Sequence, residues 1–152
     1  MGLKETLQSD LTEAIRSRDE LTSGTIRMVL TAITNEEVSG KSARTLSDAE
    51  IITVLSREAK KRREAAEAFA EAGRADRAEQ EKSEGDVIAR YLPEQLSEAA
   101  IKEIIATAIA TSGASGPAGM GAVMKLVTPQ TAGKADGGTV SRLVKEALTG
   151  GN

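Results

Sequence analysis

The chain has 152 residues, with 20 lysine and arginine residues against 23 aspartate and glutamate residues, so its formal net charge is −3. This near-balance is not typical of a polybasic RNA coat, and the 39% content of apolar residues argues against a disordered acidic tail. The sequence contains neither cysteine nor histidine. This excludes disulfide scaffolds, thiolate metal sites, cysteine nucleophiles and histidine general bases, so we expect no metal and no cofactor.

Aromatic residues are almost absent, since Phe69 and Tyr91 are the only two. A surface that stacks unpaired bases needs several exposed rings, so this mode of nucleic-acid binding is disfavoured. The other apolar residues are mainly Ala, Leu, Ile and Val among many Glu, Lys and Arg, which favours an all-α fold. No apolar run has the length of a membrane span or a signal peptide, so we expect a cytoplasmic protein with no membrane partner.

Two helices are predicted in the first 40 residues. The first helix is predicted over residues 3–18, and residues 19–20 are expected at its end. Its apolar residues share one face of the helix and are Leu3, Leu7, Leu11, Ala14 and Ile15. The second pattern covers residues 26–38, with Val38 as its last core contact and Gly40 as its stop. Both patterns have the spacing of amphipathic helices.

The third helix has the clearest start. Ser47 and Glu50 match a capping box, in which each side chain would bond the backbone N–H of the other, and Gly73 is the expected stop. Its apolar stripe is interrupted by Arg62 and consists of Ile52, Leu55, Ala59, Ala66 and Phe69. At Arg62 the stripe has either left the core, or the side chain lays its stem along the stripe and carries its charge out to solvent.

A weaker helical pattern follows over residues 74–92. Its first part is polar nearly all round, and Gly85 is expected to weaken or break it, at a cost of about 1 kcal/mol relative to alanine. The predicted core contacts lie near its end and are Val87, Ile88, Tyr91 and Leu92.

Glycine content and helix length change after residue 92. Pro93 ends the preceding helix, Ser97 is a good N-cap for a helix that Gly113 ends, and its apolar set is Ile101, Ile104, Ile105, Ala108 and Ile109. A short helix is expected over residues 120–127 and is closed by Pro129. Asp136-Gly137 indicates a turn before a last helix that glycines 150 and 151 terminate; its apolar stripe is Val140, Leu143, Val144, Ala147 and Leu148. We therefore predict an N-terminal helical domain, residues 1–92, and a small three-helix domain, residues 93–152.

Two basic segments are candidates for phosphate contact. Residues 60–63 are four consecutive cations, but neighbours on a helix point about 100° apart, so an ion-paired, solvated face is favoured. From residue 118 onward there is a surplus of two positive charges in a glycine-rich stretch. The candidate nucleic-acid-binding residues there are Lys125, Lys134, Arg142, Lys145, Gly121 and Gly137. The alternative is that these are ordinary turn glycines and helix-end cations.

Carboxylate pairs offer little for catalysis. Glu36 and Glu37 are adjacent, so their side chains diverge on a helix, and no apolar pocket is evident to raise a pKa. No catalytic residue and no metal ligand are assigned.

Five stretches of the chain resemble the GatB/YqeY family, and in particular its stand-alone YqeY-like proteins. The five stretches are residues 27–33, 58–69, 91–97, 120–124 and 133–141. Among them, the combination of YLPEQLS with MGAVM and GKADGG is the most specific to the family. The resemblance implies an all-α fold whose C-terminal part is similar to the tail domain of the B subunit of glutamyl/aspartyl-tRNA amidotransferase, where that domain helps to hold tRNA.

The resemblance leaves three functions open. The first is a non-catalytic tRNA-binding module or an accessory to a tRNA enzyme, with tRNA or an aminoacyl-tRNA-forming enzyme as partner. The second is a carbon–nitrogen ligase with glutamine as amido-nitrogen donor, which the family label implies. The third is a protein-interaction module built on the long third helix and the polar fourth. The oligomeric state is left open.

Overall fold

The computed structural model describes residues 2–150, and these contain seven α-helices, one 3₁₀ turn and no strand. The predicted all-α fold is therefore confirmed. The chain divides into two compact units, Met1–Leu92 and Pro93–Asn152. Whether each unit folds independently, as a domain would, stays a prediction.

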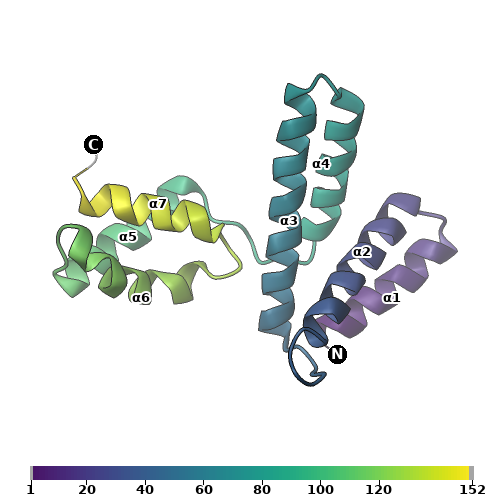
Figure 1. Cartoon of the computed structure of the whole chain (residues 1–152), viewed down its shortest axis with the longest axis horizontal. Helices are drawn as coiled ribbons and strands as arrows, with labels where there is room; N and C mark the ends of the chain where they lie inside the picture. Colours follow the sequence, from purple (N-terminus) through teal and green to yellow (C-terminus); the bar gives the residue numbers. More distant parts are fainter. Residues whose placement is uncertain (1, 151–152) are drawn as a thin grey trace. The chain divides into compact units, whose positions relative to one another are not determined.

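The first unit consists of two helical hairpins (Figure 1). One hairpin is α1 (Leu3–Arg16) with α2 (Glu20–Glu37), and the other is α3 (Asp48–Glu71) with α4 (Ala75–Ala89). Their aliphatic faces meet in one core, whose fully buried side chains include Leu7, Ile26, Ile33, Ile51, Leu55, Val87 and Ile88. Burying each such side chain stabilises the fold by roughly 1.5–3 kcal/mol, so this core holds the two hairpins together.

The break between α1 and α2 lies earlier than the sequence predicts. Asp19 does not end the first helix; it is the N-cap of α2, and its carboxylate accepts hydrogen bonds from the Thr22 N–H at 3.0 Å and the Thr22 hydroxyl at 2.7 Å. These bonds hold the pKa of Asp19 below its usual value. Ile15 and Val38 were predicted as core contacts, but they are 50% and 58% exposed. Both predictions are wrong because each residue lies at a helix end, where the side chain points away from the core.

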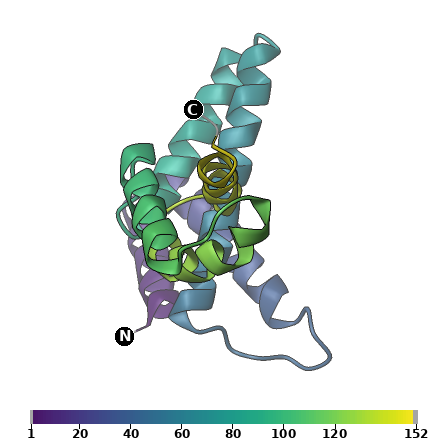
Figure 2. The ribbon, with the colours of Figure 1, turned by 90° about the vertical axis from the view of Figure 1, so that its left-hand side faces the viewer.

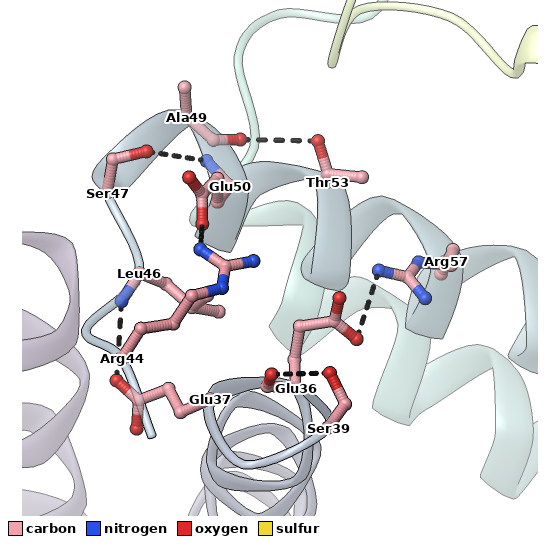
Figure 3. A network of polar contacts seen from close by, with 10 residues as sticks. All are labelled: Glu36, Glu37, Ser39, Arg44, Leu46, Ser47, Ala49, Glu50, Thr53 and Arg57. Atoms are coloured by element: carbon pink, nitrogen blue, oxygen red, sulfur yellow. Dashed lines mark hydrogen bonds and ion pairs between the residues drawn. The ribbon is translucent and has the colours of Figure 1, made fainter. Parts of the chain in front are cut away.

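The segment between α2 and α3 is an extended loop (Figure 2) fixed at its ends by carboxylates. Ser47 caps α3 by accepting from the Glu50 N–H at 3.2 Å, as predicted. The Glu50 carboxylate, however, pairs with Arg44 instead of returning to Ser47, so half of the capping box is wrong (Figure 3). Glu37 accepts from the Lys4 ammonium at 2.8 Å, which lowers the pKa of Glu37, and also from the Leu46 N–H.

Helix α4 continues through Gly85 without a break, contrary to the prediction. Gly85 faces Arg62 of α3, and a β-carbon placed there would lie 3.8 Å from the Arg62 β-carbon. The helix survives one glycine because Val87 and Ile88 are buried against the core and hold its last turns in place.

The second unit is a three-helix bundle of α5 (Glu98–Ser112), α6 (Met120–Thr131) and α7 (Gly137–Leu148), with a 3₁₀ turn, Pro117–Gly119, ahead of α6. Each helix packs against the other two. Ser97 caps α5 by accepting from the Ala100 N–H at 3.1 Å, and Gly113 ends it with a φ of 67°, both as predicted. The core comprises Ile101, Ile105, Ala108, Val123, Val127, Val140, Leu143, Val144 and Leu148.

The predicted end of α6 is wrong, whereas the boundary before α7 agrees with the prediction. Pro129 lies inside α6 and does not close it, because proline removes only one backbone donor and side chains bond the preceding turn: Gln130 to the Leu126 carbonyl at 3.0 Å and Thr131 to the Val127 carbonyl at 3.1 Å. The chain turns before α7 as predicted, and Asp136 is the N-cap of that helix. The predicted stop at Gly151 lies outside the described residues, and no helix of residues 2–150 is long and apolar enough to cross a membrane.

Candidate nucleic-acid interface

The four predicted cations of the second unit are all exposed. Lys125 lies on α6, Lys134 lies between α6 and α7, and Arg142 and Lys145 lie three residues apart on α7. Residues three apart share one face of a helix, so α7 brings two of the four cations together. Lys125 and Lys134 belong to other elements.

Arg142 differs from the three lysines because it is ion-paired. Its guanidinium lies 3.0 Å from Glu146 and 3.9 Å from Glu98, and Glu98 in turn lies 3.7 Å from Lys102. Among the described residues, no carboxylate forms an ion pair with Lys125, Lys134 or Lys145. The positive charge available to an anion therefore comes from the three lysines more than from Arg142.

The two candidate glycines lie at helix N-termini that differ in charge. Gly121 is the second residue of α6, whose first turn holds no acidic side chain and whose N-cap, Gly119, offers no side-chain cap. Gly137 is the first residue of α7, where the Asp136 carboxylate accepts from the Thr139 N–H at 3.0 Å and the Thr139 hydroxyl at 3.1 Å. An approaching phosphate meets partial positive charge alone at α6 but a carboxylate at α7.

Lys134 is positioned by hydrogen bonds that local sequence patterns do not predict. The Leu96 N–H donates to the Lys134 carbonyl at 2.8 Å, and the Gln95 side-chain amide donates to the carbonyls of Pro93 at 2.8 Å and Gly133 at 2.9 Å. These bonds join the YLPEQLS segment to the GKADGG segment, beside a shallow depression of about 450 Å³ lined by Glu94, Gln95, Leu96, Ser97, Ala100 and Lys134. In the sequence, the only sign of these hydrogen bonds is that the motifs YLPEQLS and GKADGG occur in the same chain.

The basic run at residues 60–63 does not form a cationic patch. Lys61 lies 3.2 Å from the Glu58 carboxylate, and the Arg62 guanidinium lies 3.6 Å from Glu58 and 3.8 Å from Glu84. The Arg62 side chain is only 11% exposed and also contacts the Met28 sulfur at 3.3 Å. Neither interpretation of Arg62 is therefore correct: the charge remains inside the unit, between two carboxylates.

The single tyrosine is a hydrogen-bond donor. Its hydroxyl donates to the Asp10 carboxylate at 2.6 Å, and partial burial together with this bond raises the pKa of Tyr91. A phenol held in its protonated form near neutral pH supplies no general base. In the described part of the chain, no group of three acidic residues could hold a metal ion.

Fold and surface define an all-α protein of two compact helical units, the second of which carries lysines that pair with no carboxylate among the described residues. Residues 4–148 match the family described as Yqey-like protein, and the chain belongs to this family. This confirms the resemblance that the five stretches predict.

Two fungal proteins are similar over part of the chain. "Uncharacterized protein C22F3.15" of Schizosaccharomyces pombe is 32% identical over 96 residues, which cover 63% of this chain and 76% of that protein. "Altered inheritance of mitochondria protein 41, mitochondrial" of Candida glabrata is 32% identical over 89 residues, which cover 59% of this chain and 49% of that protein. The chain thus matches about half the length of this second relative.

Proposed function

We propose that the chain is a non-catalytic module that binds tRNA, alone or as an accessory to an aminoacyl-tRNA-forming enzyme. The observation that carries this proposal is a set of three exposed lysines on the second unit for which residues 2–150 supply no carboxylate partner: Lys125, Lys134 and Lys145. Family membership supports it, since the second unit is the part that resembles the tRNA-holding tail domain of an amidotransferase subunit.

Binding would use local charge, because the chain as a whole is negative, with a formal net charge of −3. Each lysine that meets a phosphate releases counterions, so affinity falls steeply as salt rises. The backbone amides at the start of α6, near Gly121, add a further place for a phosphate oxygen. The start of α7, near Gly137, contributes less while Asp136 is ionised.

The test is a filter-binding titration of tRNA over a range of salt concentrations. Replacing Lys125, Lys134 and Lys145 together with alanine removes up to three phosphate contacts, so the slope of log K against log salt should fall by about one unit per contact. R142A alone should change the slope less, because its charge is shared with Glu98 and Glu146. The matched control K41A/R63A/R77A removes three exposed cations from the first unit.

Two results would count against the proposal. One is a wild-type chain with no affinity for tRNA at low salt, and the other is a triple-lysine variant that binds as tightly as the control. Circular dichroism of each variant shows whether the helices are retained, so that a lost interaction is not mistaken for a lost fold.

The carbon–nitrogen ligase alternative is tested separately. The purified chain is incubated with misacylated tRNA and glutamine, and amidated product is measured. We expect no product, because the sequence has no cysteine or histidine to release ammonia from glutamine or to move protons near neutral pH. Turnover would show that the module is an enzyme.

The cellular location of the module is also a proposal. We predict the cytoplasm from the sequence, whereas the printed name of the Candida glabrata relative places that protein in mitochondria. Imaging of a tagged chain in its own cells distinguishes the two locations.

A further inference from the structure

A groove of about 880 Å³ runs between α5 and α7 on the surface of the second unit. Its floor is formed by the aliphatic side chains of Ile105, Ile109 and Leu143. The ridges on either side carry exposed alanines, and the rims carry one charge of each sign; these are Ala106, Ala110 and Ala147 with Lys102 and Glu146.

Helix α5 is apolar on more than its core face. Ile101, Ile105 and Ala108 are buried in the bundle, yet Ala106 and Ala110 are exposed where a surface helix usually carries charged residues. The alanines permit close approach of another helix, because the distance between packed helix axes, 8–10 Å in general, is set by the side chains at the contact.

The two rim charges lie level with one another across the groove. Glu98 of α5 lies 3.9 Å from Arg142 of α7, and the hydrogen bond between Leu96 and Lys134 joins the segments that precede the two helices. Lys102 is one turn beyond Glu98, and Glu146 is one turn beyond Arg142. The groove is therefore lined by a cation on α5 and an anion at the same height on α7.

We propose that this groove pairs with the same groove of a second copy of the chain. A two-fold axis parallel to α5 and α7 places α5 of one copy over α7 of the other. Each Lys102 then faces the partner's Glu146, and the two charge pairs form together because both lie at one height. A patch with a single sign of charge would repel itself in such an arrangement, whereas this one is self-complementary.

The interface is small, so the dimer is a weak one. Eight of the described residues line the groove, far fewer than the 20–30 residues per partner of a stable interface, which points to rapid exchange at micromolar or higher concentration. Lys125 and Lys145 do not line the groove, so pairing leaves them exposed. This proposal stands on apolar shape and charge and does not rest on tRNA binding.

The first experiment measures self-association of the whole chain by sedimentation equilibrium, from about 10 µM to several hundred µM, the range where weak interfaces associate. Ala110→Glu places a charge in the apolar part of the groove and should raise the dissociation constant at least about tenfold. Ala122→Glu, on the exposed side of α6 outside the groove, is the matched control and should leave it unchanged.

The second experiment reverses the rim charges. Lys102→Glu and Glu146→Lys each place like charges opposite one another and should weaken the dimer several-fold at low salt, while the double variant, which keeps opposite charges across the interface but loses the pairs with Glu98 and Arg142, should dimerise more tightly than either single variant. A chain that stays monomeric throughout the concentration range overturns the proposal and leaves the groove to a helix of another protein. A dimer that Ala110→Glu does not weaken, or a double variant that dimerises no more tightly than the single variants, overturns it as well.

Discussion

The two units carry their positive charge in opposite ways. In the first unit, Lys61 and Arg62 belong to the densest basic run of the sequence, yet Glu58 and Glu84 pair with them and the Arg62 side chain is almost buried. In the second unit, Lys125 and Lys145 lie far apart in the sequence, yet both are exposed and neither pairs with a carboxylate in the part of the chain that the structure describes.

The density of cations along a sequence is therefore a poor guide to a cationic surface. On a helix, a residue meets the side chains three or four positions away, and those positions decide whether its charge is neutralised. Glu58 lies at such positions relative to Lys61 and Arg62, whereas no acidic residue lies three or four positions from Lys125. The following predictions test this contrast between the ion-paired cations of the first unit and the exposed cations of the second.

The largest effect is expected from Arg62→Ala. This change removes the cation that lies between the carboxylates of Glu58 on α3 and Glu84 on α4. Removing one partner of a buried ion pair lowers the free energy of unfolding by about 3 kcal/mol or more. The free energy of unfolding is measured in urea. Arg63→Ala, on the exposed side of the same helix, should change it by no more than about 0.5 kcal/mol.

A companion variant removes the whole cluster. R62M/E58Q/E84Q leaves no buried charge unpaired, because the Lys61 ammonium that loses Glu58 is exposed to solvent, so most of the stability lost in Arg62→Ala should return. If Arg62→Ala and Arg63→Ala are equally stable, the internal ion pairs of the first unit contribute nothing and the contrast between the units fails.

One glycine from each unit should respond to alanine with opposite sign. Gly85 has helical geometry and space for a β-carbon, so Gly85→Ala should stabilise the chain by up to about 1 kcal/mol. Gly113 has a φ of 67°, a left-handed conformation that costs other residues about 1–2 kcal/mol, so Gly113→Ala should destabilise it. The unfolding temperatures of both variants are measured. A shift in the same direction for both would contradict the left-handed conformation of Gly113 at the end of α5.

A smaller effect concerns the start of α7. Asp136→Asn keeps a capping oxygen for Thr139 but removes the negative charge near Gly137, so tRNA affinity should rise roughly two- to fivefold at low salt. The same filter-binding titration measures it. Asp76→Asn, in the first turn of α4, is the matched control and should have no effect on affinity.

The smallest effect is the acid sensitivity of the first unit at Asp19. Its pKa is lowered in the folded state by bonds from the Thr22 N–H and hydroxyl, so its contribution to stability is present above the unfolded value near pH 4 and is lost as pH falls below it. Asp19→Asn should therefore be less stable than wild type at neutral pH, and the difference should disappear toward about pH 2. Urea midpoints across that range are the measurement. The difference should shrink, without vanishing, in a Thr22→Val background.

Much of the fold follows from local signals in the sequence. Ser47 and Ser97 cap their helices, Gly73 and Gly113 follow the ends of theirs, and the aliphatic spacing of α5 and α7 marks the buried faces. These features were predictable because each depends on residues within one or two helical turns.

The errors arise where distant parts of the chain meet. Gly85 does not break α4 because buried neighbours hold the helix, and Arg62 stays inside because Glu84 comes from another helix. In the candidate interface, the exposure of the lysines was predictable, but the pairing of Arg142 with Glu98 and the bonds from Gln95 to residue 133 were not. Such contacts depend on packing that spacing along one helix does not encode.

The bonds from Gln95 and Leu96 also set an order of events during protein synthesis. Gln95 and the carbonyl of Gly133 that accepts from it are 38 residues apart, and the whole of α5 and α6 lies between them. The ribosome must release that whole stretch before the native bonds can form. The segment that precedes α5 therefore lacks these bonds until the start of α7 is about to emerge.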